Sequence, residues 1–347
     1  MKLGLVPQNP VEWLALRANL VPVPLAHTQI SFVLAQAVLD ATELGVFEAL
    51  ADAPQSLPET AARTRLNERA LRSLLHVLLA AGYLRYDDAR YDLTPMARKW
   101  CLRASPDSLA DQQAFNEVCW KWMASMKEFL RTGQGLQYHD TFDEREWALY
   151  QRGMESVSRR AAQESVRLAP RLRRPTRMLD LGGAHGRYSL AFCQRYPGLQ
   201  ATILDLPPAV AQAEPLLRQH AGTELITYQP GNALTDDLGT DTYDVVLISS
   251  LMHHFTAEQN RLVSAKIARA LRPGGYLLIQ EFLRPEPGPR MEMTAAILDL
   301  FFNLSSTSGN YSADELRAFQ TGAGLRHRRI RAFLAPPGFA QVVAQKP

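Results

Sequence analysis

The sequence predicts a chain of two kinds of structure, a mostly helical N-terminal part and an α/β domain with a parallel sheet covered by helices. Beyond Met178, apolar strand patterns alternate with helical patterns, which is typical of such a sheet. A glycine-rich stretch, residues 182–186, joins the first of these strands to a helix. Ahead of it, helical patterns and a short hairpin at residues 83–94 follow one another in the order of a winged helix.

Composition narrows the class of protein. The chain has 347 residues, enough for two hydrophobic cores at about 150 residues per domain. Its 46% hydrophobic and 21% charged content is typical of globular proteins. A net charge of +3 gives no case for nucleic acid or an anionic membrane. The three cysteines are odd in number and lack metal-type spacing, so we expect a reducing compartment and no disulfide framework.

The N-terminal apolar residues predict neither a signal peptide nor a membrane span. Only Lys2 is basic ahead of the first apolar stretch, which prolines interrupt. The longest uncharged run, residues 18–39, contains Pro22, Pro24 and several polar residues, so a buried helix behind a proline bend explains it better. We therefore expect a soluble cytoplasmic protein that does not bind membranes.

The N-terminal part has the element order of a DNA-binding module or of a dimerisation module. Its last helix carries only two basic residues, Arg69 and Arg72, whereas phosphate contacts need several on one face. The helix over 29–50 is apolar on most of its circumference, which favours burial against another chain. We expect a homodimer and no nucleic-acid partner. The predicted elements are helices at 11–20, 29–50, 57–64 and 67–81, and hairpin strands at 83–86 and 91–94.

Residues 106–170 are predicted to be helices linking the two domains. They are rich in aromatic residues and methionine. Such side chains at helical spacing are more often core than ligand pocket, although a segment between domains is a common place for a ligand cleft. Both interpretations stay open. The predicted division is a dimerisation domain over 1–105, a helical lid over 106–170 and a catalytic domain over 171–347.

The α/β domain is predicted to contain seven strands. A short link at residues 335–338 makes the last two strands antiparallel, and a turn is expected at 272–275. The predicted strands are 178–181, 200–204, 225–228, 243–249, 276–281, 328–333 and 339–344. The predicted helices are 186–196, 208–220, 257–271, 290–303 and 313–322.

The glycine stretch excludes two common nucleotide-binding loops. A dinucleotide loop needs G-x-G-x-x-G, but counting from Gly182 its later glycine positions hold Ala184 and Arg187, and a P-loop fails as well. What remains is a strand containing Asp180, glycines that permit positive φ, and Asp205 after the second strand. A carboxylate at that place can bind both hydroxyls of a ribose. The pattern favours a nucleoside with a small amino-acid tail over NAD.

Six motifs then occur in order at ordinary spacings: LDLGGAHG, DLPPAV, GNAL, DVVLISSLMHH, ALRPGGYLLIQE and YSADELRAFQTGAGL. Together they resemble the S-adenosylmethionine-dependent class I methyltransferases of the small-molecule O-methyltransferase family, known from plants and bacterial natural-product pathways. The resemblance covers about residues 30–345. It implies a Rossmann-like sheet of seven strands with the last antiparallel, a winged-helix homodimerisation domain and S-adenosylmethionine as cofactor.

The resemblance implies a cofactor site at the strand ends. The glycine loop would hold the methionine part through its backbone, Asp205 the ribose, and Asn232 with Ala233 the adenine, where the family usually has an aspartate first. Ala184 stands where relatives often have a third glycine, and we expect binding to tolerate its methyl group. The implied set is Asp180, Gly182, Gly183, Gly186, Asp205, Leu206, Asn232, Ala233 and Ser249.

The resemblance also implies a catalytic histidine after the fourth strand. The family usually has Leu-His-Asp-Trp there, so in Met252-His253-His254-Phe255 the base is His253, and His254 replaces the aspartate. The family orients its histidine with carboxylates; Glu281 matches one, and Asn310 replaces the other. A histidine in the first turn of a helix is also a common polar cap. Adjacent histidines suggest a metal, but neighbours in a helix diverge by about 100°, so we expect none.

Three functional hypotheses follow. The first is methyl transfer to a hydroxyl of a small aromatic molecule. The second is methyl transfer to carbon or nitrogen, because the two lost carboxylates weaken the case for deprotonating a phenol. The third is cofactor binding without transfer. The implied substrate-binding residues are Trp120, Met123, Met154, His254, Met293, Phe302 and Asn303.

Overall fold

The computed structural model describes residues 4–289, 291–334 and 336–347. These residues divide into two compact units, Met1–Glu117 and Val118–Pro347, which we describe separately. The domain boundaries expected near residues 105 and 170 remain predictions. Arg290 and Ala335, at the expected start of a helix and in the expected last turn, lie outside the described residues.

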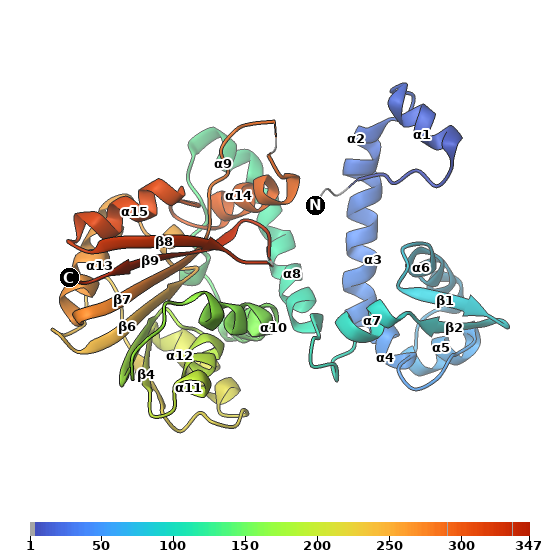
Figure 1. Ribbon diagram of the computed structural model, residues 1–347. Helices are drawn as coiled ribbons and strands as arrows, with labels where there is room; N and C mark the ends of the chain where they lie inside the picture. The colour runs from blue at the N-terminus through green and yellow to red at the C-terminus, as the bar shows by residue number, and fades with distance from the viewer. Residues whose placement is uncertain (1–3, 290, 335) are drawn as a thin grey trace. The chain divides into compact units, whose positions relative to one another are not determined.

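The N-terminal unit consists of helices and one antiparallel hairpin (Figure 1). The helix predicted over 29–50 is wrong as a single element: it is broken at Gly45, whose φ of +71° belongs to the left-handed region. The hairpin follows the helices as predicted. The elements are α1 (Pro10–Arg17), α2 (Val23–Leu25), η1 (Ala26–Ile30), α3 (Ser31–Glu43), α4 (Val46–Ala49), α5 (Leu57–Thr64), α6 (Glu68–Ala80), β1 (Leu84–Asp87), β2 (Arg90–Leu93) and α7 (Pro95–Trp100), followed by α8 (Ala110–Trp122).

The core of this unit lies mainly on α4, α6 and the hairpin, and α3 adds Ala41 to it. Leucines of α6 and the hairpin pack on Phe47 and Leu50, all of them buried. By contrast, α1 and α3 expose large apolar side chains, among them Trp13, Phe32 and Val33. Exposed apolar residues grouped in this way commonly mark an interaction surface.

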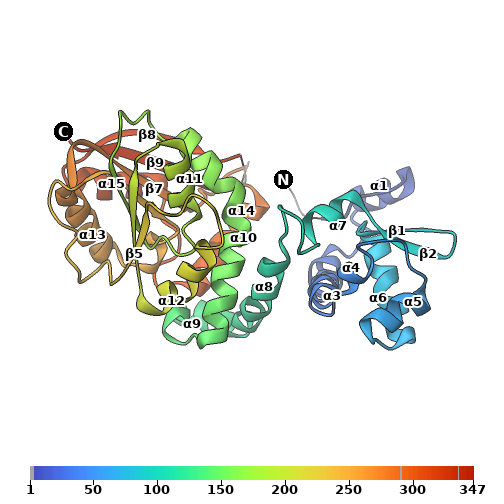
Figure 2. The same ribbon diagram turned by 90° about the horizontal axis from the view of Figure 1, so that it is seen from below.

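The C-terminal unit is built on one seven-stranded sheet in the order β5-β4-β3-β6-β7-β9-β8 (Figures 1 and 2). Neighbours from β5 to β7 are parallel, and β9 runs antiparallel to both β7 and β8, as predicted. The strands are β3 (Arg177–Leu181), β4 (Gln200–Asp205), β5 (Ile226–Pro230), β6 (Tyr243–Ser249), β7 (Leu271–Phe282), β8 (Arg326–Ala332) and β9 (Phe339–Gln345).

Helices cover both faces of this sheet. On one face, α10 (Glu144–Leu168), α11 (Arg187–Arg195) and α12 (Pro207–Leu217) share one apolar cluster with the strands. On the other face, α13 (Ala257–Ala270) and α15 (Ala313–Gly322) share a second cluster. The remaining elements are α9 (Met126–Thr132), α14 (Met293–Ser305) and the short 3-10 helices η2 (Met123–Ser125), η3 (Tyr138–Asp140) and η4 (Met252–His254).

One predicted turn of this unit is found within a strand. The turn expected at 272–275 lies inside β7, where the pairing with β6 shifts register between Tyr243 and Val245. In the described part of the chain, no helix has the length and apolarity needed to cross a membrane.

Candidate active site

The carboxyl ends of the parallel strands bring the predicted residues to one edge of the sheet. Leu181 pairs with Leu204 on one side and with Ile248 on the other. Ser249 pairs with Gln280 of the next strand. The glycine loop, Asp205, the two histidines and Glu281 therefore all start from the same edge, where open α/β sheets bind their ligands.

The glycine loop is held in a left-handed conformation at its centre. Ala184 has a φ of +44°, an unusual value for a residue with a side chain. Its backbone N–H donates to Asp205 Oδ2 at 2.8 Å, and its carbonyl accepts from the Tyr228 hydroxyl at 2.9 Å. The acid expected to bind ribose thus also fixes the shape of the loop, which explains how alanine is accommodated there.

The loop glycines are required by the protein's own packing. Gly182 and Gly186 have φ values of +69° and +71°. A Cβ on Gly183 would lie 2.6 Å from the Asp180 Cγ and 2.9 Å from a methyl group of Ile203. The loop therefore rests directly on the sheet, and the Gly182 N–H donates to the Leu204 carbonyl at 2.8 Å.

Two carboxylates lie under the loop, the buried Asp180 and the half-buried Asp205. Burial raises the pKa of Asp205 to about 6, against the hydrogen bonds from Ala184 and Leu206. Burial likewise raises the pKa of Asp180 to about 7, although Ser189 donates to its Oδ2 at 2.7 Å. Asp180 Oδ1 is buried and has no hydrogen-bond partner among the described residues. An unpaired carboxylate oxygen at this place suits a cationic ligand such as the ammonium group of a bound amino acid.

The residues expected around adenine form a tight turn after β5. The Asn232 side-chain oxygen accepts from the Leu234 N–H at 2.9 Å, and Lys266 donates to the Ala233 carbonyl at 2.8 Å. Leu206 donates its N–H to Asp205 Oδ1 at 2.7 Å. This turn leads out of the strand next to the one that ends at Asp205.

His253 and Glu281 form a buried pair. The imidazole Nδ1 lies 2.9 Å from Glu281 Oε2, and the exposed fractions of the two residues are 3% and 1%. Glu281 Oε1 accepts the Met252 N–H at 2.7 Å. His253 lies in η4, between the end of β6 and α13, which begins after its capping residue Thr256.

The rings of the two adjacent histidines, His253 and His254, lie 4.2 Å apart in the 3-10 turn η4. The His254 ring also lies 4.6 Å from the His139 ring. Burial, and then the charge of His253, lower the pKa of His139 to about 3. Burial also lowers the pKa of His254 well below its usual value. Both rings are therefore neutral near pH 7, when each can donate one hydrogen bond and accept another.

Aromatic rings surround this histidine pair. The His139 ring stacks on Trp147 at 5.3 Å, and Phe302 approaches the His253 ring at 4.9 Å. We call this set the aromatic wall, and it supplies flat apolar surface with neutral hydrogen-bonding edges. It consists of Trp122, Tyr138, His139, Phe142, Trp147, Tyr150, His254, Phe301 and Phe302.

The predicted substrate residues are only partly members of this wall. His254 and Phe302 belong to it, and Asn303 lies on the same helix as Phe302. Trp120 and Met123 have exposed fractions of 41% and 38%, whereas Met154 and Met293 are half-buried, and the roles of all four remain predictions. His139 was missed because it lies outside every motif that the family resemblance uses.

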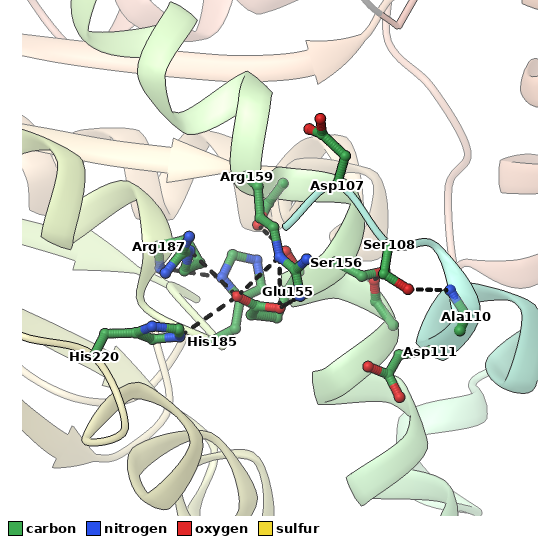
Figure 3. Close-up of polar contacts among 12 residues, drawn as sticks. Asp107, Ser108, Ala110, Asp111, Glu155, Ser156, Arg159, His185, Arg187 and His220 are labelled. Atoms are coloured by element: carbon green, nitrogen blue, oxygen red, sulfur yellow. Dashed lines mark hydrogen bonds and ion pairs between the residues drawn. The ribbon is translucent and has the colours of Figure 1, made fainter. Parts of the chain in front are cut away.

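An ion cluster joins α10 to the glycine loop (Figure 3). Glu155, which is buried, lies 2.9 Å from Arg159, 3.3 Å from Arg187 and 3.6 Å from His220. His185, inside the loop, accepts the Arg187 backbone N–H at 3.1 Å, and burial lowers its pKa to about 4. The cluster therefore anchors the end of the loop on α10.

Metal binding and disulfide formation are the two remaining kinds of chemistry that the side chains could support. In the described ranges, no group of three or more histidine, cysteine, aspartate or glutamate side chains is placed to hold a metal ion. Cys101, Cys119 and Cys193 are buried free thiols.

Comparison with known proteins identifies the family. The model of the O-methyltransferase domain matches residues 121–326, and that of the O-methyltransferase dimerisation domain matches residues 26–103. The chain belongs to the O-methyltransferase family. This confirms the S-adenosylmethionine-dependent methyltransferase family expected from the motifs.

Individual relatives of this O-methyltransferase family member cover three quarters or more of its length. It is 28% identical over 320 residues to the 3-hydroxy-5-methyl-1-naphthoate 3-O-methyltransferase of Streptomyces sahachiroi, covering 89% of this chain and 90% of the relative. It is also 28% identical to an L-tyrosine C(3)-methyltransferase of Streptomyces lavendulae, covering 76% and 75%. The fold matches human N-acetylserotonin methyltransferase in complex with SAM with a TM-score of 0.80, at 22% identity and 99% coverage of both chains.

Proposed function

We propose that this enzyme transfers the methyl group of S-adenosylmethionine to a hydroxyl of a small aromatic molecule. The buried pair of His253 and Glu281 carries this proposal, since it offers a base at the end of β6 beside the aromatic wall. The relative from Streptomyces sahachiroi, named for O-methylation of a hydroxynaphthoate, supports an aromatic acceptor.

The residues at the strand ends fit the cofactor. Bound S-adenosylmethionine supplies an electrophilic methyl group on a sulfonium centre. Asp180 would face its ammonium group with the unpaired Oδ1, and Asp205 would accept its ribose hydroxyls with lone pairs left beside the two backbone donors. The positive end of the α11 dipole would favour its carboxylate.

His253 would remove the proton of the acceptor hydroxyl. Its Nδ1 is engaged by Glu281, which leaves Nε2 as the ring nitrogen that can accept a proton. Glu281 would fix the tautomer and stabilise the imidazolium, as the acid of a catalytic triad does. A positioned base contributes about 10²–10⁴-fold to such a reaction.

The aromatic wall would bind the acceptor ring. Its histidines, His139 and His254, are neutral, so the wall offers stacking and hydrogen bonds without a countercharge for an anion. It therefore suits a flat acceptor that is uncharged where it touches these two rings.

A second candidate is methyl transfer to carbon or nitrogen. Asn310 provides no carboxylate near the base, and a relative with 28% identity is named as an L-tyrosine C(3)-methyltransferase. An amine or an activated carbon needs less base than a phenol does. The His253→Ala variant separates the two, because O-transfer should fall much more than N-transfer.

The deciding experiment incubates the enzyme with S-adenosylmethionine and a panel of phenols, amines and aromatic amino acids. Product mass gives the number of methyl groups, and fragmentation gives the atom methylated. Tight binding of S-adenosylmethionine without any methylated product would contradict the proposal and support the third hypothesis, a cofactor-binding protein without transfer.

The assembly that we propose is a homodimer in the cytoplasm, without a nucleic-acid partner. Support comes from the match to a dimerisation domain and from the exposed apolar side chains of α1 and α3, such as Trp13 and Phe32. Light scattering after gel filtration tests the mass. A shift assay with duplex DNA at low salt tests the last point, and a shifted band would contradict it.

A further inference from the structure

We propose that Asp299 is a positioning residue that presents the amide oxygen of Asn310 to the acceptor. The site would then prefer acceptors with a hydroxyl or amino group beside the reacting hydroxyl. This inference rests on the proposed methyl transfer and adds a class of acceptor to it.

The Asn310 side chain is buried and bonded on one side only. Its exposed fraction is 2%, and Nδ2 donates to Asp299 Oδ1 at 3.2 Å. Its own Oδ1 is buried and finds no hydrogen-bond partner within the described ranges. Since buried polar atoms are nearly always paired, a free oxygen of this kind indicates a missing donor.

The carboxylate of Asp299 fixes which way this amide points. An ionised carboxylate only accepts hydrogen bonds, so it must face the amide NH₂ of Asn310 and turn the oxygen away. The helix that carries Asp299 packs closely on the loop that carries Asn310, because a Cβ on Gly309 would lie 2.1 Å from the side-chain oxygen of Asn303.

Contacts on both sides of Asn310 place it beside the catalytic turn. The Ser308 N–H donates to the His253 carbonyl at 3.1 Å, and the Tyr311 hydroxyl donates to the Phe255 carbonyl at 2.7 Å. Asp299 shares α14 with Phe302, whose ring lies 4.9 Å from the His253 ring. Asn310 therefore lies in a loop whose neighbouring residues contact the turn that carries His253.

A second donor on the acceptor would pair with this oxygen while the reacting hydroxyl faces His253. Sites built to hydrogen-bond a polar group discriminate strongly against ligands that lack it, because their own polar atom is then left unpaired. We expect kcat/KM to be at least about tenfold higher for such an acceptor than for its analogue with a single hydroxyl.

The test compares 2,3-dihydroxynaphthalene with 2-naphthol, which differ by one hydroxyl. The wild-type enzyme should prefer the diol about tenfold or more, and Asp299→Asn should bring the ratio close to one, because its amide no longer dictates the orientation of Asn310. Asn310→Leu should do the same, and the double variant should lose nothing further. Asp314→Asn, which changes an exposed aspartate paired with Arg317, is the matched control and should keep the ratio.

The outcomes separate this inference from the proposed function. Calorimetry with S-adenosylhomocysteine present measures the preference for the two naphthols in binding, whether or not methyl transfer occurs. A wild-type ratio near one in both assays, or an unchanged ratio in Asp299→Asn, would overturn the role of Asp299. Failure of the wild type to methylate any acceptor would instead contradict the proposed function.

Discussion

His253, in the turn η4 that follows β6, and Glu281, on the neighbouring strand β7, meet with Nδ1 and Oε2 2.9 Å apart. The second carboxylate oxygen is held by the Met252 N–H at 2.7 Å, so the glutamate binds the turn and the ring together. Because the pair is buried, a proton taken up at Nε2 would be stabilised mainly by this one carboxylate.

Replacing either member of the pair should separate catalysis from binding. His253→Ala should lower kcat for O-methylation by about a hundredfold, since a general base contributes about 10²–10⁴-fold. Glu281→Gln should lower it less, because the amide can still orient the ring but carries no charge. Steady-state kinetics at saturating cofactor measures both variants. Glu258→Gln, an exposed glutamate of α13, is the control and should leave kcat unchanged.

The sequence was enough to predict which site residues lie at the strand ends, but it was not enough to predict the aromatic wall around them. Alternating strand and helix patterns place Asp180, Asp205 and the histidine pair at one edge without knowledge of packing. His139 reaches His254 only because separate segments of the chain pack together, and no local pattern encodes that contact. The break at Gly45 was missed because a single glycine is tolerated inside an apolar helix.

Cofactor binding should release protons near pH 6.5. Burial raises the pKa of Asp180 to about 7, so this carboxyl is largely protonated in the free enzyme, and a ligand ammonium beside it would lower that pKa. Affinity for S-adenosylmethionine should therefore rise as pH increases from about 5 to about 7. Calorimetry in two buffers of different ionisation enthalpy should give different heats. Asp180→Asn should remove most of the difference, and an undiminished difference would contradict the assignment.

The raised pKa of Asp180 also makes the stability of the folded chain depend on pH. Asp180 holds its proton to a higher pH in the folded chain than its usual value of 3.8 allows in the unfolded chain. Its contribution therefore makes folding less stable as pH rises from about 4 to about 7. The Asp180→Asn variant should lack this part of the pH dependence in urea unfolding without cofactor.

A methyl group on Gly183 should disrupt the loop. Its Cβ would lie 2.6 Å from the Asp180 Cγ and 2.9 Å from Ile203, both of which are buried. Overpacking of this kind costs about 1–3 kcal/mol, and it would push the loop off the sheet. Gly183→Ala should therefore lower the melting temperature and abolish measurable cofactor binding. Gly288→Ala is the control, because no atom lies within 4 Å of its Cβ position.

Removing the charge of Glu155 should loosen the glycine loop from α10. Burial opposes ionisation of Glu155, but the hydrogen bonds and charge of Arg159, and then the charge of Arg187, outweigh it and keep the pKa below its ordinary value of 4.5. Glu155→Gln removes the buried negative charge that Arg159 and Arg187 share, which should cost about 2 kcal/mol or more, somewhat below a fully buried pair because the arginines are partly exposed. Affinity for S-adenosylhomocysteine should fall several-fold, because Glu155 holds Arg187, and the Arg187 N–H holds His185 of the loop.

The pH dependence of this Glu155 variant distinguishes an ionic role from a steric one. A carboxylate with a depressed pKa stabilises the folded state above about pH 4.5, and this contribution is lost as pH falls through the lower folded pKa. The difference in unfolding free energy between wild type and Glu155→Gln should hence be constant from pH 5 to 7 and shrink below that range. Glu214→Gln removes an exposed pair with Arg218 and should change stability by less than about 1 kcal/mol. If the Glu155 difference persisted unchanged down to pH 3, packing rather than charge would hold the loop.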